Sequence, residues 1–186
     1  MSPAQIRRCY GEITGLRDAV AEQPIAPSVP AGTVTDDTEQ ALILAGLLID
    51  GGGRIDPHQL ADALLSWEDD MRARGSLDLL GPSTKLALER VRAGADPRCT
   101  GREGTTNGAA MRVAPVGIAF SLSTDGNALA QAVHASCLVT HDTRQGFEAA
   151  GLLAAAVSAA IDGVDAAGAL KAALDFVAAH PEEGHW

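Results

Sequence analysis

Aromatic residues are scarce in this chain: Phe, Trp and Tyr make up 3% of the 186 residues, although 46% of the chain is hydrophobic. The core must therefore consist mainly of Ala, Leu and Val side chains, which suits close packing of helices better than broad sheets. Alternation of apolar and polar residues, the pattern of strands, does not extend over useful lengths. We predict an all-α fold in one domain, residues 1–186, with enough apolar surface for a core.

Cysteines and long apolar runs are also few. The three cysteines, Cys9, Cys99 and Cys137, are odd in number and show no paired spacing, which argues against a disulfide framework or a zinc site. The longest apolar run, residues 149–161, is shorter than the roughly 20 residues needed to cross a bilayer. Residues 1–15 lack the apolar segment of a secretory signal. We therefore expect a cytoplasmic protein with no membrane partner.

Basic residues are outnumbered by acidic ones. The chain has 14 Lys and Arg against 24 Asp and Glu, which gives a formal net charge of −10. A nucleic-acid backbone is an unsuitable partner, because its binding needs a basic face that releases counterions. A nucleotide-like small molecule is not excluded.

Helix signals follow one another along the chain. Residues 21–34 contain three prolines and are predicted to form an extended lead-in. A helix over 38–49 is almost wholly apolar after Gln40, which predicts burial on all sides. Pro115 either kinks a buried helix that follows a glycine-rich loop or lies at a break in it. Another predicted helix begins at Pro57 and ends before Gly75. The next begins at Pro82 and Ser83 and ends at Gly94. Three further helices are predicted over residues 127–138, 145–161 and 166–179.

The stretch Thr35-Asp36-Asp37-Thr38 lies directly before the apolar helix and has two interpretations. Thr and Asp at a helix start can accept hydrogen bonds from unpaired backbone N–H groups and complement the helix dipole. Two adjacent carboxylates also repel each other, and a cation such as Mg²⁺, which prefers oxygen ligands, would neutralise both. The sequence alone leaves capping and metal binding equally open.

Three other polar stretches are candidates for chemistry, each with a plain structural alternative. Asp78 is a lone carboxylate in a loop, and its structural alternative is an ordinary turn residue or a solvated one. Residues 103–108 are small and polar, so that backbone N–H groups can approach an anion, although most glycine-rich turns are only turns. His141, between Thr140 and Asp142, interrupts two apolar helices, and a histidine there is often a helix C-terminal cap.

The order of these motifs resembles one family. The segments TDDTEQALILA, LDLLGPSTKLALERVRAG, GTTNGAAMRVAPVGIA and VTHDTRQGFEAAGLLAAAVSAAIDG are similar, in that order, to the ADP-ribosylglycohydrolases, which include the glycohydrolase that reactivates dinitrogenase reductase. The resemblance covers residues 32–163. It implies an all-α orthogonal helical bundle around two Mg²⁺ ions, or Mn²⁺ in their place. It also implies hydrolysis of an N- or O-glycosidic bond at the anomeric carbon of ADP-ribose, in an ADP-ribosylated protein or a small ADP-ribosyl compound.

The resemblance also implies roles for individual residues. The first set of metal ligands matches Thr35, Asp36 and Asp37. Asp78 matches a carboxylate that acts on the leaving group or the water, and His141 matches a histidine on the substrate side. The remaining substrate-binding residues belong to the loop that wraps the diphosphate and the distal ribose, and to the helix after it: Gly104, Thr105, Thr106, Asn107, Gly108 and Met111.

Two family features are not found in this sequence. The glycine-rich start of the type GDALG and its following glutamate do not occur before Ile6, and no second paired aspartate motif of the type DTDT follows Asp142. The chain therefore resembles the central part of a family member, with half of the expected metal site. Three functions remain open: a glycohydrolase, a non-catalytic ADP-ribose-binding module, and a remnant that depends on a partner. We expect the chain alone to self-associate or to need a second chain.

Overall fold

The computed structural model describes residues 1–75 and 80–181, and every regular element in those ranges is helical. The predicted all-α class is confirmed. None of the described helices is both long and apolar enough to cross a membrane. In chain order the elements are α1 (Pro3–Tyr10), α2 (Asp36–Asp50), α3 (Pro57–Ala73), α4 (Pro82–Arg92), the 3₁₀ turn η2 (Pro97–Cys99), α5 (Gly108–Arg112), α6 (Ala114–Ala119), α7 (Gly126–Cys137), α8 (Arg144–Ile161) and α9 (Ala166–Ala179).

Capping residues explain why the helices begin where the sequence predicts. Asp56 accepts hydrogen bonds from the N–H groups of His58 and Gln59 at the start of α3, and Asp165 accepts one from Gly168 at the start of α9. Pro115 lies in the first turn of α6, so it marks a break between α5 and α6 and not a kink within one helix. Residues 21–34 contain no helix, as predicted.

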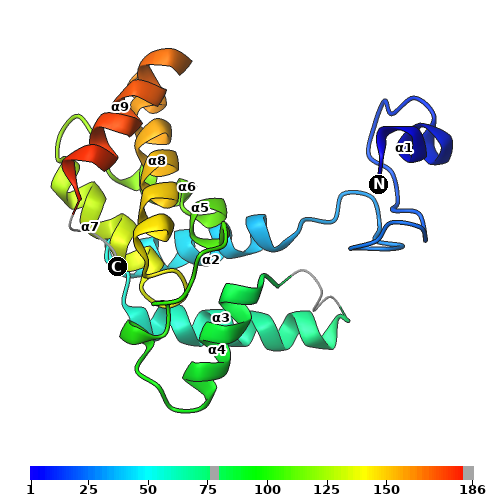
Figure 1. Cartoon of the computed structure of the whole chain (residues 1–186), viewed down its shortest axis with the longest axis horizontal. Coiled ribbons are helices and arrows are strands. Elements are labelled where there is room, and N and C mark those ends of the chain that lie inside the picture. The colour runs from blue at the N-terminus through cyan, green and yellow to red at the C-terminus, as the bar shows by residue number, and fades with distance from the viewer. Residues whose placement is uncertain (76–79, 182–186) are drawn as a thin grey trace.

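The helices form two groups joined by α2. In Figure 1, α3 and α4 lie on one side of α2, and α7, α8 and α9 lie on the other. The short helices α5 and α6 contact both α2 and α8, so they connect the acidic helix start to the alanine-rich group. Helix α1 stands apart from the bundle at the end of the extended lead-in (Figure 1).

Small side chains allow the helices to approach closely. On α8 the buried face includes Ala150, Ala154 and Ala155, all with 0% exposure. A Cβ atom added to Gly117 of α6 would meet the backbone carbonyl of Ala154, so only glycine fits at this crossing. The aromatic-poor core therefore packs as the composition predicts.

The prediction that α2 is buried on all sides is wrong. Its buried residues are Gln40, Leu44 and Leu48, whereas Leu42 is 66% exposed and Ile49 is 77% exposed. Helices α3, α5 and α6 cover only part of the circumference of α2. The uncovered part of α2 and the neighbouring α6 line an apolar groove of about 420 Å³, which includes Leu42, Ile49 and Ile118.

Candidate functional site

The two adjacent aspartates occupy the first turn of α2. Thr35 is the N-cap residue, but its side chain makes no capping hydrogen bond and instead donates from its hydroxyl to Asp37 Oδ2 at 3.2 Å. Asp36 and Asp37 complement the positive end of the helix dipole, as first-turn carboxylates do. This placement satisfies the capping interpretation in part, and the direction of the side chains decides whether they can do more.

Glu39, one turn into the same helix, fixes the start of α2 against α3. Its carboxylate accepts a hydrogen bond from the indole N–H of Trp67 at 2.7 Å and two from the guanidinium of Arg74 at 3.0 Å. Hydrogen bonding from Arg74 lowers the pKa of Glu39 below its usual value. These charge-assisted bonds hold the aspartates in place, and sequence reasoning did not single out Glu39.

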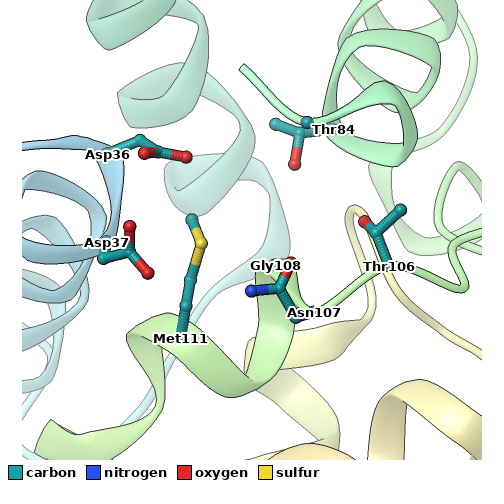
Figure 2. A pocket seen from close by; sticks show the side chains of 8 residues that line it. Asp36, Asp37, Thr84, Thr106, Asn107, Gly108 and Met111 are labelled. Atoms are coloured by element: carbon teal, nitrogen blue, oxygen red, sulfur yellow. The ribbon is translucent and has the colours of Figure 1, made fainter. Parts of the chain in front are cut away.

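Both aspartates face a small cavity of about 160 Å³. Figure 2 shows their carboxylates on one side, the side chains of Thr84 and Thr106 on the other, and Met111 and Asn107 between them. The cavity therefore joins the start of α2, the start of α4 and the loop that leads into α5. The lining residues are Asp36, Asp37, Gly81, Thr84, Thr106, Asn107, Gly108 and Met111.

The electrostatics of the cavity favour a cation. Burial raises the pKa of Asp36, and the neighbouring charge of Asp37 raises it further. Of the described residues that line the cavity, none is a Lys, Arg or His that could neutralise the two carboxylates. A bound cation would stabilise both carboxylates in their charged form.

The loop at residues 104–107 is held by two neighbouring segments. Ser83 at the start of α4 accepts hydrogen bonds from the backbone N–H groups of Thr105 and Thr106, at 3.3 and 3.4 Å. On the other side, the Thr143 hydroxyl donates to the carbonyl of Gly104 at 2.7 Å. The loop thereby presents Thr106 and Asn107 to the cavity.

Gly104 is expected to tolerate no side chain. A Cβ atom added there would overlap the backbone carbonyl of Thr140, which cannot move as a flexible side chain could. We expect Gly104→Ala to lower the free energy of unfolding by about 1–3 kcal/mol. The matched control is Gly46→Ala in α2, where an added Cβ meets nothing within 4 Å and helix propensity predicts a gain of up to about 1 kcal/mol. Urea unfolding of both variants checks this, and equal stabilities would contradict the close approach of the loop to Thr140.

Comparison with known proteins decides the family. The family model described as ADP-ribosylglycohydrolase matches residues 1–185. The chain belongs to the ADP-ribosylglycohydrolase family. The resemblance seen over residues 32–163 is thereby confirmed, and the match extends over nearly the whole chain.

Longer relatives of this family member occur in bacteria and archaea. YegU, an uncharacterized protein of Escherichia coli K12, is 34% identical over 149 residues, which are 80% of this chain and 44% of the relative. An uncharacterized protein of Archaeoglobus fulgidus is 33% identical over 141 residues, which are 76% of this chain and 42% of the relative. The chain thus spans less than half the length of the relatives it matches.

The glycohydrolase-family residues fall into three groups in the structure. Asp36, Asp37, Thr106, Asn107, Gly108 and Met111 line one cavity. Others lie outside that lining: Thr35 lines a separate groove beside residues 25–30, Gly104 is buried against Thr140, and Thr105 is exposed. Asp78 lies outside the described residues. Thr84 and Gly81 line the cavity although sequence reasoning missed them, and their only signal was their place in the segment GPST of the family resemblance.

His141 lies behind the cavity and does not line it. Its side chain is fully buried, and its Nε2 atom is 2.9 Å from the hydroxyl oxygen of Thr106. A Cβ atom added to Gly108 would meet the imidazole ring, so the ring packs directly under the start of α5. Burial and the nearby charge of Arg112 lower the pKa of His141 to about 3, which keeps the ring neutral.

Arg112 is the largest polar side chain buried beneath this family site. It is 0% exposed, and its guanidinium donates to Gln40 Oε1 at 3.0 Å, to the carbonyl of Ser136 at 2.9 Å and to the hydroxyl of Thr140 at 2.6 Å. All three acceptors are neutral, and burial lowers the pKa of Arg112 to about 10. The bond to Gln40 ties α5 to α2 one turn after Asp36, and thus ties the loop to the aspartates.

The donor set of the site fits Mg²⁺ in kind but not in number. Two carboxylates and the hydroxyl group of Thr84 are hard oxygen ligands. Among the residues that the structure describes, no group of three or more His, Cys, Asp or Glu side chains could hold a metal ion. Because Mg²⁺ keeps several waters in many protein sites, Asp36 and Asp37 suit a loosely held ion whose other positions are filled by water or ligand.

Proposed function

We propose that this chain carries the metal-binding and ADP-ribose-binding part of a hydrolase that cleaves the glycosidic bond of ADP-ribosyl groups. The substrate would be an ADP-ribosylated protein or a small ADP-ribosyl compound. One observation supports the proposal most. The adjacent carboxylates lie far in the sequence from the loop residues Thr106, Asn107 and Gly108, yet both groups line one cavity. Membership of the ADP-ribosylglycohydrolase family supplies the reaction class.

Asp36 and Asp37 would hold Mg²⁺ in this proposal. When bound, such an ion supplies Lewis acidity and lowers the pKa of a coordinated water. The chain's own residues would bind and orient the substrate. The Thr106 hydroxyl and the Asn107 amide offer hydrogen bonds to its oxygens, and Met111 forms an apolar wall that limits water.

The size of the cavity indicates how much of the substrate it can hold. About 160 Å³ is less than the roughly 300–1,000 Å³ of pockets that enclose a whole drug-sized ligand. The cavity therefore suits one part of an ADP-ribosyl group, such as a ribose or a phosphate. The rest of the ligand would extend over the exposed residues of the loop.

A second candidate, a binding module that depends on a partner, is favoured by two observations. Among the residues that the structure describes, two carboxylates face the cavity, and the apolar groove between α2 and α6 leaves Leu42, Ile49 and Ile118 exposed. Exposed apolar surface of this kind promotes association. In this alternative the chain binds ADP-ribose but releases no product by itself.

The rate of product release separates these candidates. We expect the 186-residue chain to release ADP-ribose at least about a thousandfold more slowly than an enzyme with a complete metal pair, because losing one metal forfeits several kcal/mol and each 1.36 kcal/mol is a factor of ten. Chromatography of ADP-ribosylated peptides of several linkages, with Mg²⁺ or with a chelator, measures this rate.

Three variants show whether any remaining release of ADP-ribose depends on the two aspartates of the cavity. Asp36→Asn and Asp37→Asn should abolish it, whereas Asp50→Asn at the exposed C-terminal end of α2 should leave it unchanged. Release that resists both the chelator and the cavity variants would refute the metal-assisted hydrolase. ADP-ribose binding without any release would leave the binding module.

A further inference from the structure

A continuous chain of hydrogen bonds connects the buried Arg112 to the cavity. Arg112 donates to Thr140 Oγ1 at 2.6 Å, Thr140 Oγ1 is 2.7 Å from His141 Nδ1, and His141 Nε2 is 2.9 Å from Thr106 Oγ1. Arg112, Thr140 and His141 are all 0% exposed. Thr106 is the only one of the four that lines the cavity.

The direction of each bond follows from the chemistry of the first. A guanidinium has only donors, so the Thr140 oxygen must accept from Arg112. The single hydrogen of the Thr140 hydroxyl then needs an acceptor, and His141 Nδ1 is the one that the described residues offer within hydrogen-bond distance. The opposite arrangement, with Nδ1–H donating to Thr140, would leave a buried hydroxyl hydrogen unpaired, which is costly.

The tautomer of the His141 ring sets the direction of the last hydrogen bond, which reaches the cavity. With Nδ1 accepting, the neutral ring must hold its hydrogen on Nε2, which then donates to Thr106 Oγ1. The low pKa of His141 agrees with a neutral ring at pH 7. The Thr106 oxygen already accepts from His141, so its own hydrogen is directed to the cavity, which it lines beside Asn107 and Gly108.

We infer that Arg112, acting through Thr140 and His141, fixes the Thr106 hydroxyl as a hydrogen-bond donor into the cavity. The ligand must then present an acceptor oxygen at this point, such as a phosphate or ribose oxygen, and this part of the inference rests on the proposed function. Arg112, Thr140 and His141 are positioning residues, since none of them lines the cavity. The arrangement costs no reorganisation on binding, because the buried partners already hold the hydroxyl.

We call the hydrogen-bonded series from Arg112 through Thr140 and His141 to Thr106 the relay. The tautomer of His141 tests the relay without any ligand. Long-range ¹H–¹⁵N NMR spectra of the full chain, with the His141 signals assigned through His141→Gln, distinguish protonated from bare ring nitrogens. We expect a neutral His141 with its hydrogen on Nε2 between pH 5 and 8. A hydrogen on Nδ1, or a doubly protonated ring at pH 7, would overturn the inference.

Two variants of Thr140 show whether Thr140 sets the tautomer. Thr140→Val removes the donor to Nδ1 and should give a mixture of tautomers, whereas Thr140→Ser keeps the hydroxyl and should keep the hydrogen on Nε2. An unchanged tautomer in folded Thr140→Val would overturn the relay. If Thr140→Val fails to fold, the wild-type and Thr140→Ser spectra still decide the outcome.

Ligand binding tests the last step separately. Thr106→Val should weaken ADP-ribose binding about tenfold, the value of one hydrogen bond to a polar ligand, and Thr106→Ser should bind clearly more tightly than Thr106→Val. Equal affinities of wild type and Thr106→Val would overturn the donor role. If the wild type binds no ADP-ribose, the proposed function and the ligand step fail together, while the tautomer of His141 still decides the relay.

Discussion

Replacing Arg112 with alanine is expected to lower the free energy of unfolding by about 3–5 kcal/mol, the range for large-to-small substitutions in a core with lost polar partners. Arg112 is fully buried, and its removal would leave a void and three acceptors without their donor, on Gln40, Ser136 and Thr140. Chemical denaturation monitored by circular dichroism measures the loss.

Arg102→Ala is the matched control for this prediction. Arg102 lies in the same glycine-rich region but is exposed, so its replacement should change stability by no more than about 0.5 kcal/mol. If the free energy of unfolding of Arg112→Ala equalled that of Arg102→Ala, the result would contradict the structural role given to the buried guanidinium.

Acidification is expected to destabilise the protein through His141. Its pKa is about 3 in the folded chain, because of burial and the charge of Arg112, against about 6.5 for an unfolded histidine. Between these values the unfolded chain binds a proton that the folded chain does not, so stability falls as the pH falls. The slope from this one group is about 1.4 kcal/mol per pH unit, or about 5 kcal/mol over the whole window.

The difference between the wild type and His141→Gln over the pH range 6.5 to 5 isolates this contribution, because the other histidines are common to both proteins and most carboxylates titrate at lower pH. Urea unfolding at several pH values in this range should give the expected slope in the wild type and a flatter one in His141→Gln, whose amide does not titrate. The comparison holds even if the variant is less stable overall. Parallel slopes would mean that His141 is protonated in the folded chain, which the buried site does not allow.

Helix positions could be predicted because their signals are local. Asp56 with Pro57, and Asp165 before α9, cap helices that begin where the sequence predicts. The exposure of α2 could not be predicted in this way, because a run of apolar residues does not say whether neighbouring helices cover all sides. Leu42 and Ile49 are exposed because α3, α5 and α6 pack on the other faces.

The candidate site was predictable in its motifs and not in its supports. The adjacent carboxylates and the loop with Thr106 and Asn107 attract attention as residue types in unusual runs, and the structure brings them to one cavity. The hydrogen bonds of Glu39 to Trp67 and Arg74 join residues that are distant in the sequence, and no local sequence pattern predicts such a pairing. The position of His141 behind Thr106 likewise depends on how α5 packs.

Calorimetric titration of the chain with ADP-ribose, with and without Mg²⁺, tests the central claim most directly. That claim is that Asp36, Asp37 and the Thr106 loop form one metal-dependent ADP-ribose site. It predicts binding that requires Mg²⁺, is lost in Asp36→Asn and Asp37→Asn, and is retained in Asp50→Asn. Absence of binding, or binding that neither Mg²⁺ nor the cavity variants change, would contradict it.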